Sequence, residues 1–293
     1  MTMSIKKAAP FLLLIVTIIW GSGFTASQAA IDGGLSAAFI MFGRFLVAAL
    51  TIGLVFHKKL KNWTKKEILM SFTVGLILFF AHFTQTLGLE QTTPSKNAFL
   101  TATNVVMVPF LYWILARKQP GVKAFISAVI CFAGICILSV DFSQGMVFGV
   151  GDLLSLLCAL LFALHIAVVG YFVDKMDGIK LAFGQLAGAA IFSTIAFLIL
   201  DRDFSVIRPT IGVASVVYLG VFSTGVCFFL QTISQEHVSS TKASLILSLE
   251  SVFGTMFSIL LGYEVLKINM VLGGLMILAS IIFVEVQFKK KRV

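Results

Sequence analysis

Ten long apolar stretches run through the chain and limit what it can fold into. They occupy roughly residues 9–30, 36–56, 68–89, 95–116, 121–140, 149–173, 180–200, 211–233, 240–262 and 268–287, numbered here as spans 1 to 10. Each has about the 20 residues that a helix needs to cross a bilayer. Only 12% of the residues are charged, against about 25% in a soluble domain. The pattern predicts an all-α integral membrane protein, with one membrane domain over residues 1–293, and it excludes a cytosolic enzyme.

The Lys and Arg residues between the spans predict how the chain lies in the membrane. Seventeen of them fall in segments on the same side as the N-terminus, including Lys6, Lys7 and the cluster at 289–292, against four in the opposite segments. Cytoplasmic loops carry such an excess, so both termini are expected in the cytoplasm. This orientation also explains the net charge of +9, and nucleic acid is not an expected partner.

An internal repeat is the most informative pattern. A shift of 146 positions places Gln85 on Gln231, Lys96 on Lys242 and Asn104 on Glu250, and near span 1 a shift of about 142 places Trp20 on Phe162. Residues 8–140 and 149–287 are therefore predicted to form two five-helix repeats. Since five is odd, the second repeat runs in the opposite sense. Inverted repeats are the architecture that many secondary transporters use for alternating access.

Several short motifs resemble those of a known family. They are Trp20-Gly21-Ser22-Gly23-Phe24, Arg44-Phe45, the segment from Gln85-Thr86-Leu87-Gly88-Leu89 to Lys96 and Ala98, and Leu249-Glu250-Ser251-Val252-Phe253. With the two repeats, they resemble the EamA-type branch of the drug/metabolite transporter (DMT) superfamily. The resemblance implies a ten-helix bacterial inner-membrane carrier of small metabolites, often an exporter of amino acids or related compounds. It also implies a central cavity bounded by spans 1, 3, 4, 6, 8 and 9. Span 9 departs from the family pattern, because Ser251 stands where the family usually has proline.

Glu250 is the leading candidate for a functional residue. It lies about halfway along span 9, where a carboxylate costs roughly 2.5–3.5 kcal/mol on insertion scales unless it is paired, protonated or hydrated. We expect it to contact substrate and to exchange a proton. The alternative is a fixed hydrogen bond or ion pair that locks the bundle.

Polar residues in span 4 are predicted to share one face. Asn97, Thr101 and Asn104 are spaced by four and three residues, which puts them on one side of a helix. We expect this stripe to line the cavity. A stripe of small polar residues in span 9, which includes Ser248 and Ser251, is better explained by close helix packing in lipid.

Other residues within spans are weaker candidates. His82, three residues before Gln85, could relay protons or bind a carboxylate, or form a single hydrogen bond between helices; Gln231 repeats Gln85. Trp20 and Phe24 are expected to form an aromatic wall where Gly21 and Gly23 loosen span 1, although close helix packing explains the glycines equally well. Arg44, the one cation inside a span, is expected to snorkel to the interface.

These observations favour a secondary active or facilitative transporter, an exporter of small organic metabolites, that works by alternating access. Its expected partners are the small-molecule substrate, membrane lipids and protons, and it is expected as a monomer or homodimer. The four cysteines lie in apolar runs without metal-ligand spacing, so free thiols and no metal or cofactor are expected. Two alternatives remain: an intramembrane serine hydrolase, with Ser22 as nucleophile and His82 or His165 as base, and a passive channel or membrane scaffold.

Overall fold

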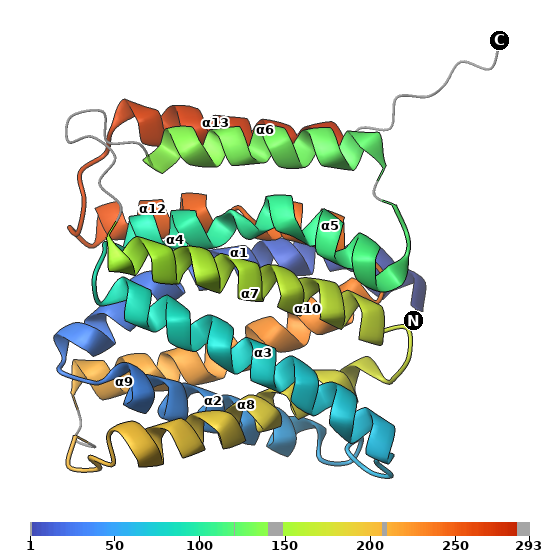
Figure 1. Cartoon of the computed structure of the whole chain (residues 1–293), viewed down its shortest axis with the longest axis vertical. Coiled ribbons are helices and arrows are strands. Elements are labelled where there is room, and N and C mark those ends of the chain that lie inside the picture. Colours follow the sequence, from blue (N-terminus) through green and yellow to red (C-terminus); the bar gives the residue numbers. More distant parts are fainter. Residues whose placement is uncertain (1, 120, 140–148, 207–209, 286–293) are drawn as a thin grey trace.

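The computed structural model describes residues 2–119, 121–139, 149–206 and 210–285, and every regular element in these ranges is helical (Figure 1). The elements are α1 (Thr2–Asp32), α2 (Ala37–Phe56), α3 (Lys65–Leu89), α4 (Pro94–Ala102), α5 (Asn104–Ala116), α6 (Val122–Ser139), α7 (Val150–Phe172), α8 (Gly178–Leu200), α9 (Ile211–Tyr218), the π-helix η1 (Leu219–Val226), α10 (Cys227–Gln235), α11 (Ser240–Leu247), α12 (Glu250–Leu260) and α13 (Ile268–Glu285). The predicted all-α fold is confirmed.

The helices correspond to the ten predicted spans. Eight apolar helical segments in the described residues are long enough to cross a membrane. Three of these consist of consecutive elements: α4–α5 in span 4, α9–η1–α10 in span 8 and α11–α12 in span 9. Two shorter apolar helices, at 122–137 and 268–283, coincide with spans 5 and 10. The basic cluster at 289–292, Arg208 and the predicted repeat ends at 140 and 287 lie outside the described residues.

Polar residues just before the apolar runs start several helices. The side chains of Ser36, Thr93 and Ser239 each accept a hydrogen bond from the backbone N–H three residues ahead, at 3.0, 3.3 and 3.4 Å. Thr64 and Glu67 form a capping box at the start of α3. These bonds satisfy donors that a helix leaves free in its first turn.

Spans of one repeat pack against spans of the other, and spans at equivalent positions have equivalent partners. Span 3 packs against spans 6 and 7, and span 8, its equivalent, packs against spans 1 and 2. In the same way span 1 packs against span 9, and span 6 against span 4. The pairs α6–α13 and α2–α8 lie at opposite edges of the bundle (Figure 1). This pattern of contacts is expected for two inverted repeats.

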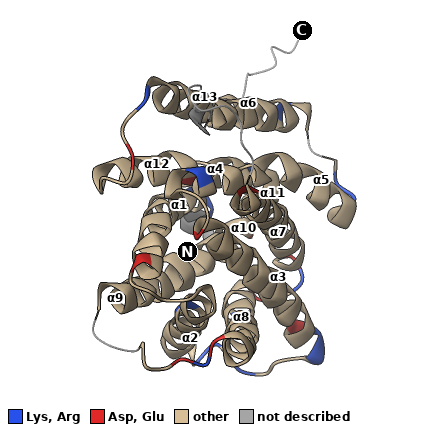
Figure 2. Cartoon of the chain, turned by 60° about the vertical axis from the view of Figure 1, so that its left-hand side comes forward, with Lys and Arg blue, Asp and Glu red and all other residues tan. Residues whose placement is uncertain are grey.

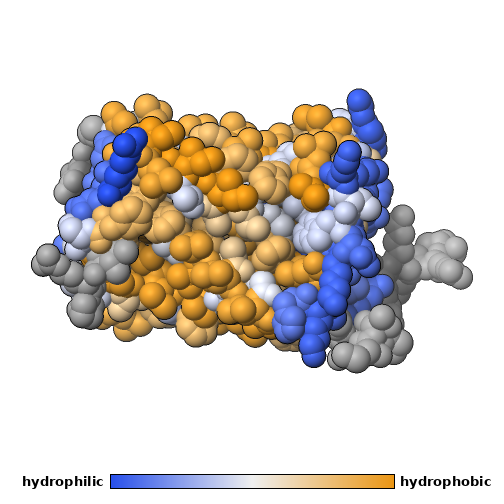
Figure 3. Space-filling model, turned by 90° about the horizontal axis from the view of Figure 1, so that it is seen from below, coloured by the Kyte–Doolittle hydropathy of each residue, from blue (hydrophilic) through white to orange (hydrophobic). Residues whose placement is uncertain are grey.

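The surface is that of a multi-pass membrane protein. On the face shown in Figure 3, a broad apolar band separates two polar ends. Leu54 and Ile199 are among the large apolar side chains that are more than half exposed. Acidic and basic residues gather at helix ends and connections (Figure 2). Because hydrocarbon accepts no hydrogen bonds, only segments that satisfy their own backbone can cross this band.

Spans 4 and 9 are interrupted at corresponding points. The interruption between α4 and α5 is at Thr103, and the shift of 146 places this residue on Leu249, between α11 and α12. Each donates its N–H to the carbonyl three residues back, at 3.2 and 3.1 Å, which tightens the turn. The hydroxyls of Thr103 and Ser248 also donate to carbonyls three residues back, both at 2.6 Å. Side-chain bonds of this kind bend helices, so span 9 is interrupted although Ser251 replaces the proline.

Span 1 is a continuous helix through its glycines. A Cβ atom on Gly21 would lie 2.5 Å from the Cβ of Phe253, and one on Gly23 would lie 2.8 Å from the Oγ of Ser223. Of the two explanations for these glycines, the structure therefore supports close helix packing, since span 1 is not loosened at either position. Close approach places α1 directly against spans 8 and 9.

Candidate functional site

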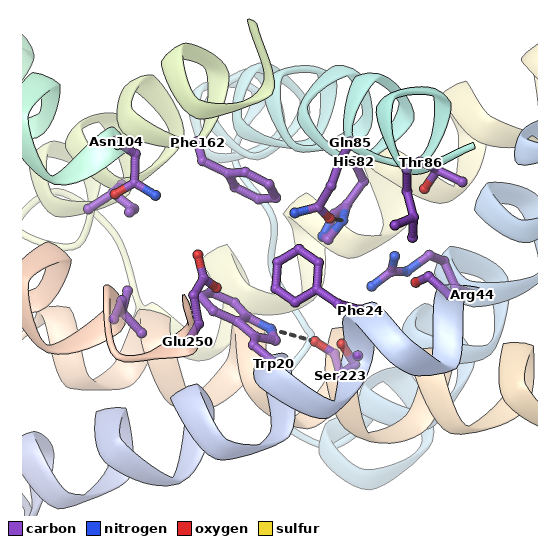
Figure 4. Close-up of a pocket in the computed structure, with 15 residues that line it drawn as sticks. Trp20, Phe24, Arg44, His82, Gln85, Thr86, Asn104, Phe162, Ser223 and Glu250 are labelled. Carbon is purple, nitrogen blue, oxygen red and sulfur yellow. Dashed lines mark hydrogen bonds between the residues drawn. The ribbon is translucent and has the colours of Figure 1, made fainter. Parts of the chain in front are cut away.

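A cavity lies at the centre of the bundle, between the two repeats (Figure 4). Its walls come from spans 1, 2, 3 and 6 and from the divided spans 4, 8 and 9. The lining residues are Trp20, Gly23, Phe24, Ser27, Arg44, His82, Gln85, Thr86, Leu89, Asn104, Phe162, Ile166, Ser223, Leu247 and Glu250. The cavity volume is about 30 Å³, room for about two water molecules. A larger ligand requires these side chains to move.

Six of the nine predicted site residues meet at this cavity. They are Trp20, Phe24, His82, Gln85, Asn104 and Glu250. The other three, Asn97, Thr101 and Gln231, are buried but do not line it. The structure therefore brings together residues from spans 1, 3, 4 and 9, which are far apart in the sequence.

The predicted stripe of span 4 divides into a cavity residue and two packing residues. Asn97 donates from Nδ2 to the backbone oxygen of Gln85 at 3.1 Å and to the Oγ of Ser155 at 2.8 Å. Thr101 accepts a bond from the Nε2 of Gln85 at 3.3 Å. These bonds tie α4 to α3 and α7. Only Asn104, at the start of α5, borders the cavity.

Gln231 has a similar structural role in span 8. It donates from Nε2 to the Oε1 of Gln235 at 3.1 Å, and its own Oε1 is buried without a protein partner. Its repeat equivalent, Gln85, lines the cavity instead. The repeat therefore conserves the residue type but not its contact with the cavity.

The two helix interruptions place Asn104 and Glu250 at equivalent points of the cavity wall. Each is the first residue of the helix after the interruption. The dipole of such a helix N-terminus favours a negative group. The residue Glu250 is only 6% exposed, and within the described ranges no side chain donates a hydrogen bond to its carboxylate or forms an ion pair with it.

Arg44 also lines the cavity, and the expectation that it snorkels to the interface is wrong. Its residue surface is only 2% exposed, and its Nε donates to the Oγ1 of Thr224 at 2.9 Å. Phe45, the next residue along α2, packs its ring 5.5 Å from that of His82. The guanidinium is drawn inward because η1 supplies an acceptor deep in the bundle.

An aromatic wall forms on one side of the cavity, as expected for Trp20 and Phe24. The indole Nε1 of Trp20 donates to the backbone oxygen of Ser223 at 2.7 Å, drawn as the dashed line in Figure 4. Its ring lies 5.1 Å from that of Phe228. Ser223 belongs to η1, where the wider π-helical turn changes the usual hydrogen bonding; π-helical turns are frequent at functional sites.

The two histidines within spans differ in position. His82 lines the cavity, and its Nδ1 lies 3.2 Å from the Oε1 of Gln85. His165 is fully buried behind the cavity, with its Nε2 2.7 Å from the Oε1 of Gln185. Both rings stand edge-on to Phe228, each at 5.4 Å. In the ranges that the structure describes, no group of three or more His, Cys, Asp or Glu residues is placed to hold a metal ion.

Ser22, the nucleophile of the hydrolase alternative, has no histidine partner. Its Oγ donates to the backbone oxygen of Ile19 at 2.7 Å and lies 2.5 Å from the hydroxyl of Tyr218. Neither His82 nor His165 forms a hydrogen bond with it. The nucleophile–base pair that this chemistry needs is therefore not assembled among these residues.

The cavity continues toward one end of the bundle, the Asp32 end, where α1 terminates. Ser27 and Leu89 line it there, near the ends of α1 and α3. At the opposite end, the N-terminal end, α7 is joined to α10 and α11. Gln235 and Ser240 both donate to the backbone oxygen of Ile166, at 2.9 and 3.3 Å. These bonds join α7 to α10 and α11 on the N-terminal side of the cavity.

The internal repeat could have identified some cavity residues that the sequence analysis did not select as site residues. The shift of about 142 that pairs Trp20 with Phe162 also pairs Phe24 with Ile166, and all four line the cavity. Arg44 has no such signal, because the matching stretch of α8, residues 186–190, contains no charged or polar residue. Its place depends on the partner element η1.

Comparisons with known proteins agree with this architecture. The model of a family described as EamA-like transporter family matches residues 7–140 and again residues 149–286. A protein of Archaeoglobus fulgidus named "Uncharacterized transporter" is 31% identical over 281 residues, which cover 94% of this chain and 85% of that protein. The "Uncharacterized transporter YvbV" of Bacillus subtilis is 24% identical, covering 98% of this chain and 94% of that protein.

The fold also matches a solved structure. A crystal structure at 14% sequence identity superposes with a TM-score of 0.78, covering 95% of this chain and 96% of that chain. At this identity the likeness concerns the fold alone.

Proposed function

Since the chain belongs to the EamA-like transporter family and is a multi-pass membrane transporter, we propose that it is a secondary carrier that exports a small amphipathic organic metabolite. Amino acids and related compounds are the proposed substrate class. The cavity at the interface of the inverted repeats is the observation that carries this proposal. A midplane site between inverted repeats is where such carriers bind substrate.

The chemistry of the cavity supports an amphipathic substrate. Aromatic side chains offer apolar contact, while Gln85 and Asn104 offer amide donors and acceptors. Glu250 adds a carboxylate that no donor among the described residues holds. Ligand sites typically combine an apolar wall with a few converging polar groups in this way.

The difference between the two ends of the cavity supports alternating access as the proposed mechanism. In the proposed orientation, with both termini in the cytoplasm, the Asp32 end faces outward and the N-terminal end inward. The bonds from Gln235 and Ser240 to Ile166 then close the inner side. If these inner contacts broke and the equivalent contacts formed in the other repeat, the outer side would close and the inner side would open.

The proposal is tested first by comparing metabolites exported by cells with and without the protein, and then by transport in liposomes. Purified protein should move the exported compound with saturable kinetics and accelerated exchange when unlabelled compound is present on the opposite side. Flux without saturation or exchange would mean a channel. No flux of any compound would favour a membrane scaffold.

A matched pair of variants ties the flux to this cavity. Phe24 lines it, whereas Phe80 on α3 is 46% exposed on the lipid-facing surface. Phe24→Ala should reduce flux per molecule strongly, and Phe80→Ala should leave it near the parental value. Equal flux in both variants would place the transport path elsewhere.

A further inference from the structure

Arg44 presents a buried positive charge to the cavity. Figure 4 shows its guanidinium extending from α2 toward the cavity centre. Only Nε has a partner, the Oγ1 of Thr224 at 2.9 Å. In the part of the chain that the structure describes, the two terminal nitrogens of the guanidinium have no hydrogen-bond acceptor.

An arginine in this position needs a counter-anion. A guanidinium cannot lose its charge in a protein and offers five N–H donors. Charged side chains within membrane spans are accordingly paired or placed in a polar pathway. Here four of the five donors are on the two terminal nitrogens, for which the described residues supply no acceptor.

No acidic residue of the described ranges supplies that anion. The ion pairs there join Lys96 to Asp152 and Lys180 to Glu67. Glu250, the acidic residue that lines the cavity, lies at the other end of it in the view of Figure 4 and forms no ion pair with Arg44. Among the described residues, the positive charge of Arg44 therefore has no counter-anion.

We propose that Arg44 is an anion subsite that binds the carboxylate of the transported solute. The inference rests on the proposed function, because it takes the cavity as the substrate path. Two terminal N–H groups in a plane match the two oxygens of a carboxylate. Thr224 accepts the hydrogen bond from Nε and so orients the planar guanidinium. It is thus a positioning residue.

The surroundings select a monoanion with an apolar body. Arg44 is the only Lys or Arg among the cavity residues, so a phosphate dianion would keep an uncompensated charge. Trp20, Phe24 and Phe162 provide apolar contact beyond the guanidinium. At the far end, Glu250 is placed to accept a cationic or hydrogen-bond-donating group of the same solute.

The subsite can be tested by binding, without knowing the transported solute. The chain has three tryptophans, and Trp63→Phe with Trp113→Phe leaves Trp20 in the cavity as the one fluorescent indole. The probes are isovalerate, which has one carboxylate and a short apolar body, and isovaleramide, its neutral isostere. Titrations in chloride-free sulfate buffer should show saturable binding of isovalerate and at least about tenfold weaker binding of isovaleramide.

Variants assign the effect to the guanidinium. Arg44→Gln should abolish the preference for isovalerate, and Arg44→Lys should weaken isovalerate binding by about tenfold because the planar fork is lost. The matched control is Arg117→Gln, at an exposed residue after α5, which should bind both probes as the parent does.

The positioning role of Thr224 provides a second test if Arg44→Gln does not fold. Thr224→Val keeps the shape but removes the acceptor, and should weaken isovalerate binding while leaving isovaleramide unchanged; Thr224→Ser should restore the parental preference. Equal binding of the two probes to the parent, or an intact preference in folded Arg44→Gln, would overturn the subsite.

Chloride and transport measurements separate the remaining outcomes. If chloride binds more tightly than isovalerate and displaces it, Arg44 holds a resident inorganic anion and the proposal is wrong. If the carboxylate preference is present but no solute crosses liposomes, the proposed function fails while the subsite stands. If flux is saturable but carboxylate and amide forms are carried equally, the subsite fails while the proposed function stands.

Discussion

At the scale of single residues, we expect Glu250 to carry the proton that is coupled to transport. It is nearly buried at the start of α12, and no donor of the described residues holds its carboxylate. Excluding water favours the neutral acid, and opening the cavity to solvent favours release of the proton. We expect Glu250→Gln, which keeps the size but cannot titrate, to lose substrate accumulation driven by a pH gradient while retaining substrate exchange.

This expectation is measured with purified variants in liposomes under an imposed pH gradient. Glu90→Gln, at an exposed residue after α3, is the control and should accumulate substrate as the parent does. Accumulation by Glu250→Gln at the parental rate would show that proton coupling does not use this residue and would favour a facilitator.

The two asparagines of span 4 should respond differently to the same substitution. Asn104→Leu changes a cavity residue and should lower flux per molecule with little loss of protein. Asn97→Leu removes bonds to Gln85 and Ser155, at a cost of about 1–3 kcal/mol, and should lower membrane abundance. Flux and abundance are measured on the same preparations. If Asn104→Leu transports as the parent does, Asn104 only packs.

At the scale of helices, the contact between α7 and α11 should act as a gate. A Cβ atom on Gly170 would lie 3.3 Å from the Cβ of Ser240, close to the separation of about 3.5–4.5 Å in disulfides. In a background without the four native cysteines, Gly170→Cys with Ser240→Cys should cross-link under mild oxidation and stop transport. Reduction should restore it.

The single variants Gly170→Cys and Ser240→Cys are the controls, and oxidation should leave their flux unchanged. Full transport by the cross-linked protein would mean that these two helices do not separate during the cycle. In that case the N-terminal side must open between other helices.

At the scale of the whole molecule, the proposed orientation is open to a direct test. The connections after α1 and α2 should face opposite sides of the membrane. Gly33→Cys should react with an impermeant thiol reagent added outside intact cells, and Lys61→Cys should react only after the membrane is opened. Lys61 is chosen rather than its neighbour Asn62, because the backbone φ of Asn62 is 57°, a conformation that strains most side chains. Outside labelling of Lys61→Cys but not of Gly33→Cys would reverse the topology.

The sequence by itself determined the spans, the repeat and the candidate residues at its centre. A membrane-spanning helix must satisfy its own backbone and present apolar side chains to lipid, so each span is a local property of about 20 residues. The repeat is likewise visible in the pairing of Gln85 with Gln231. For the same reason Glu250, a carboxylate within a span, could be selected without a partner being known.

Only the tertiary structure decided which polar residues face the cavity and which pack. By spacing, Asn97 and Asn104 lie on one helix face. Because the helix is interrupted at Thr103 and neighbouring helices offer different hydrogen-bond partners, Asn97 packs against α3 whereas Asn104 lines the cavity. Arg44 turned inward because Thr224, 180 residues away in the chain, accepts its hydrogen bond. Such choices depend on the helix that packs opposite, and that helix is not encoded within the span itself.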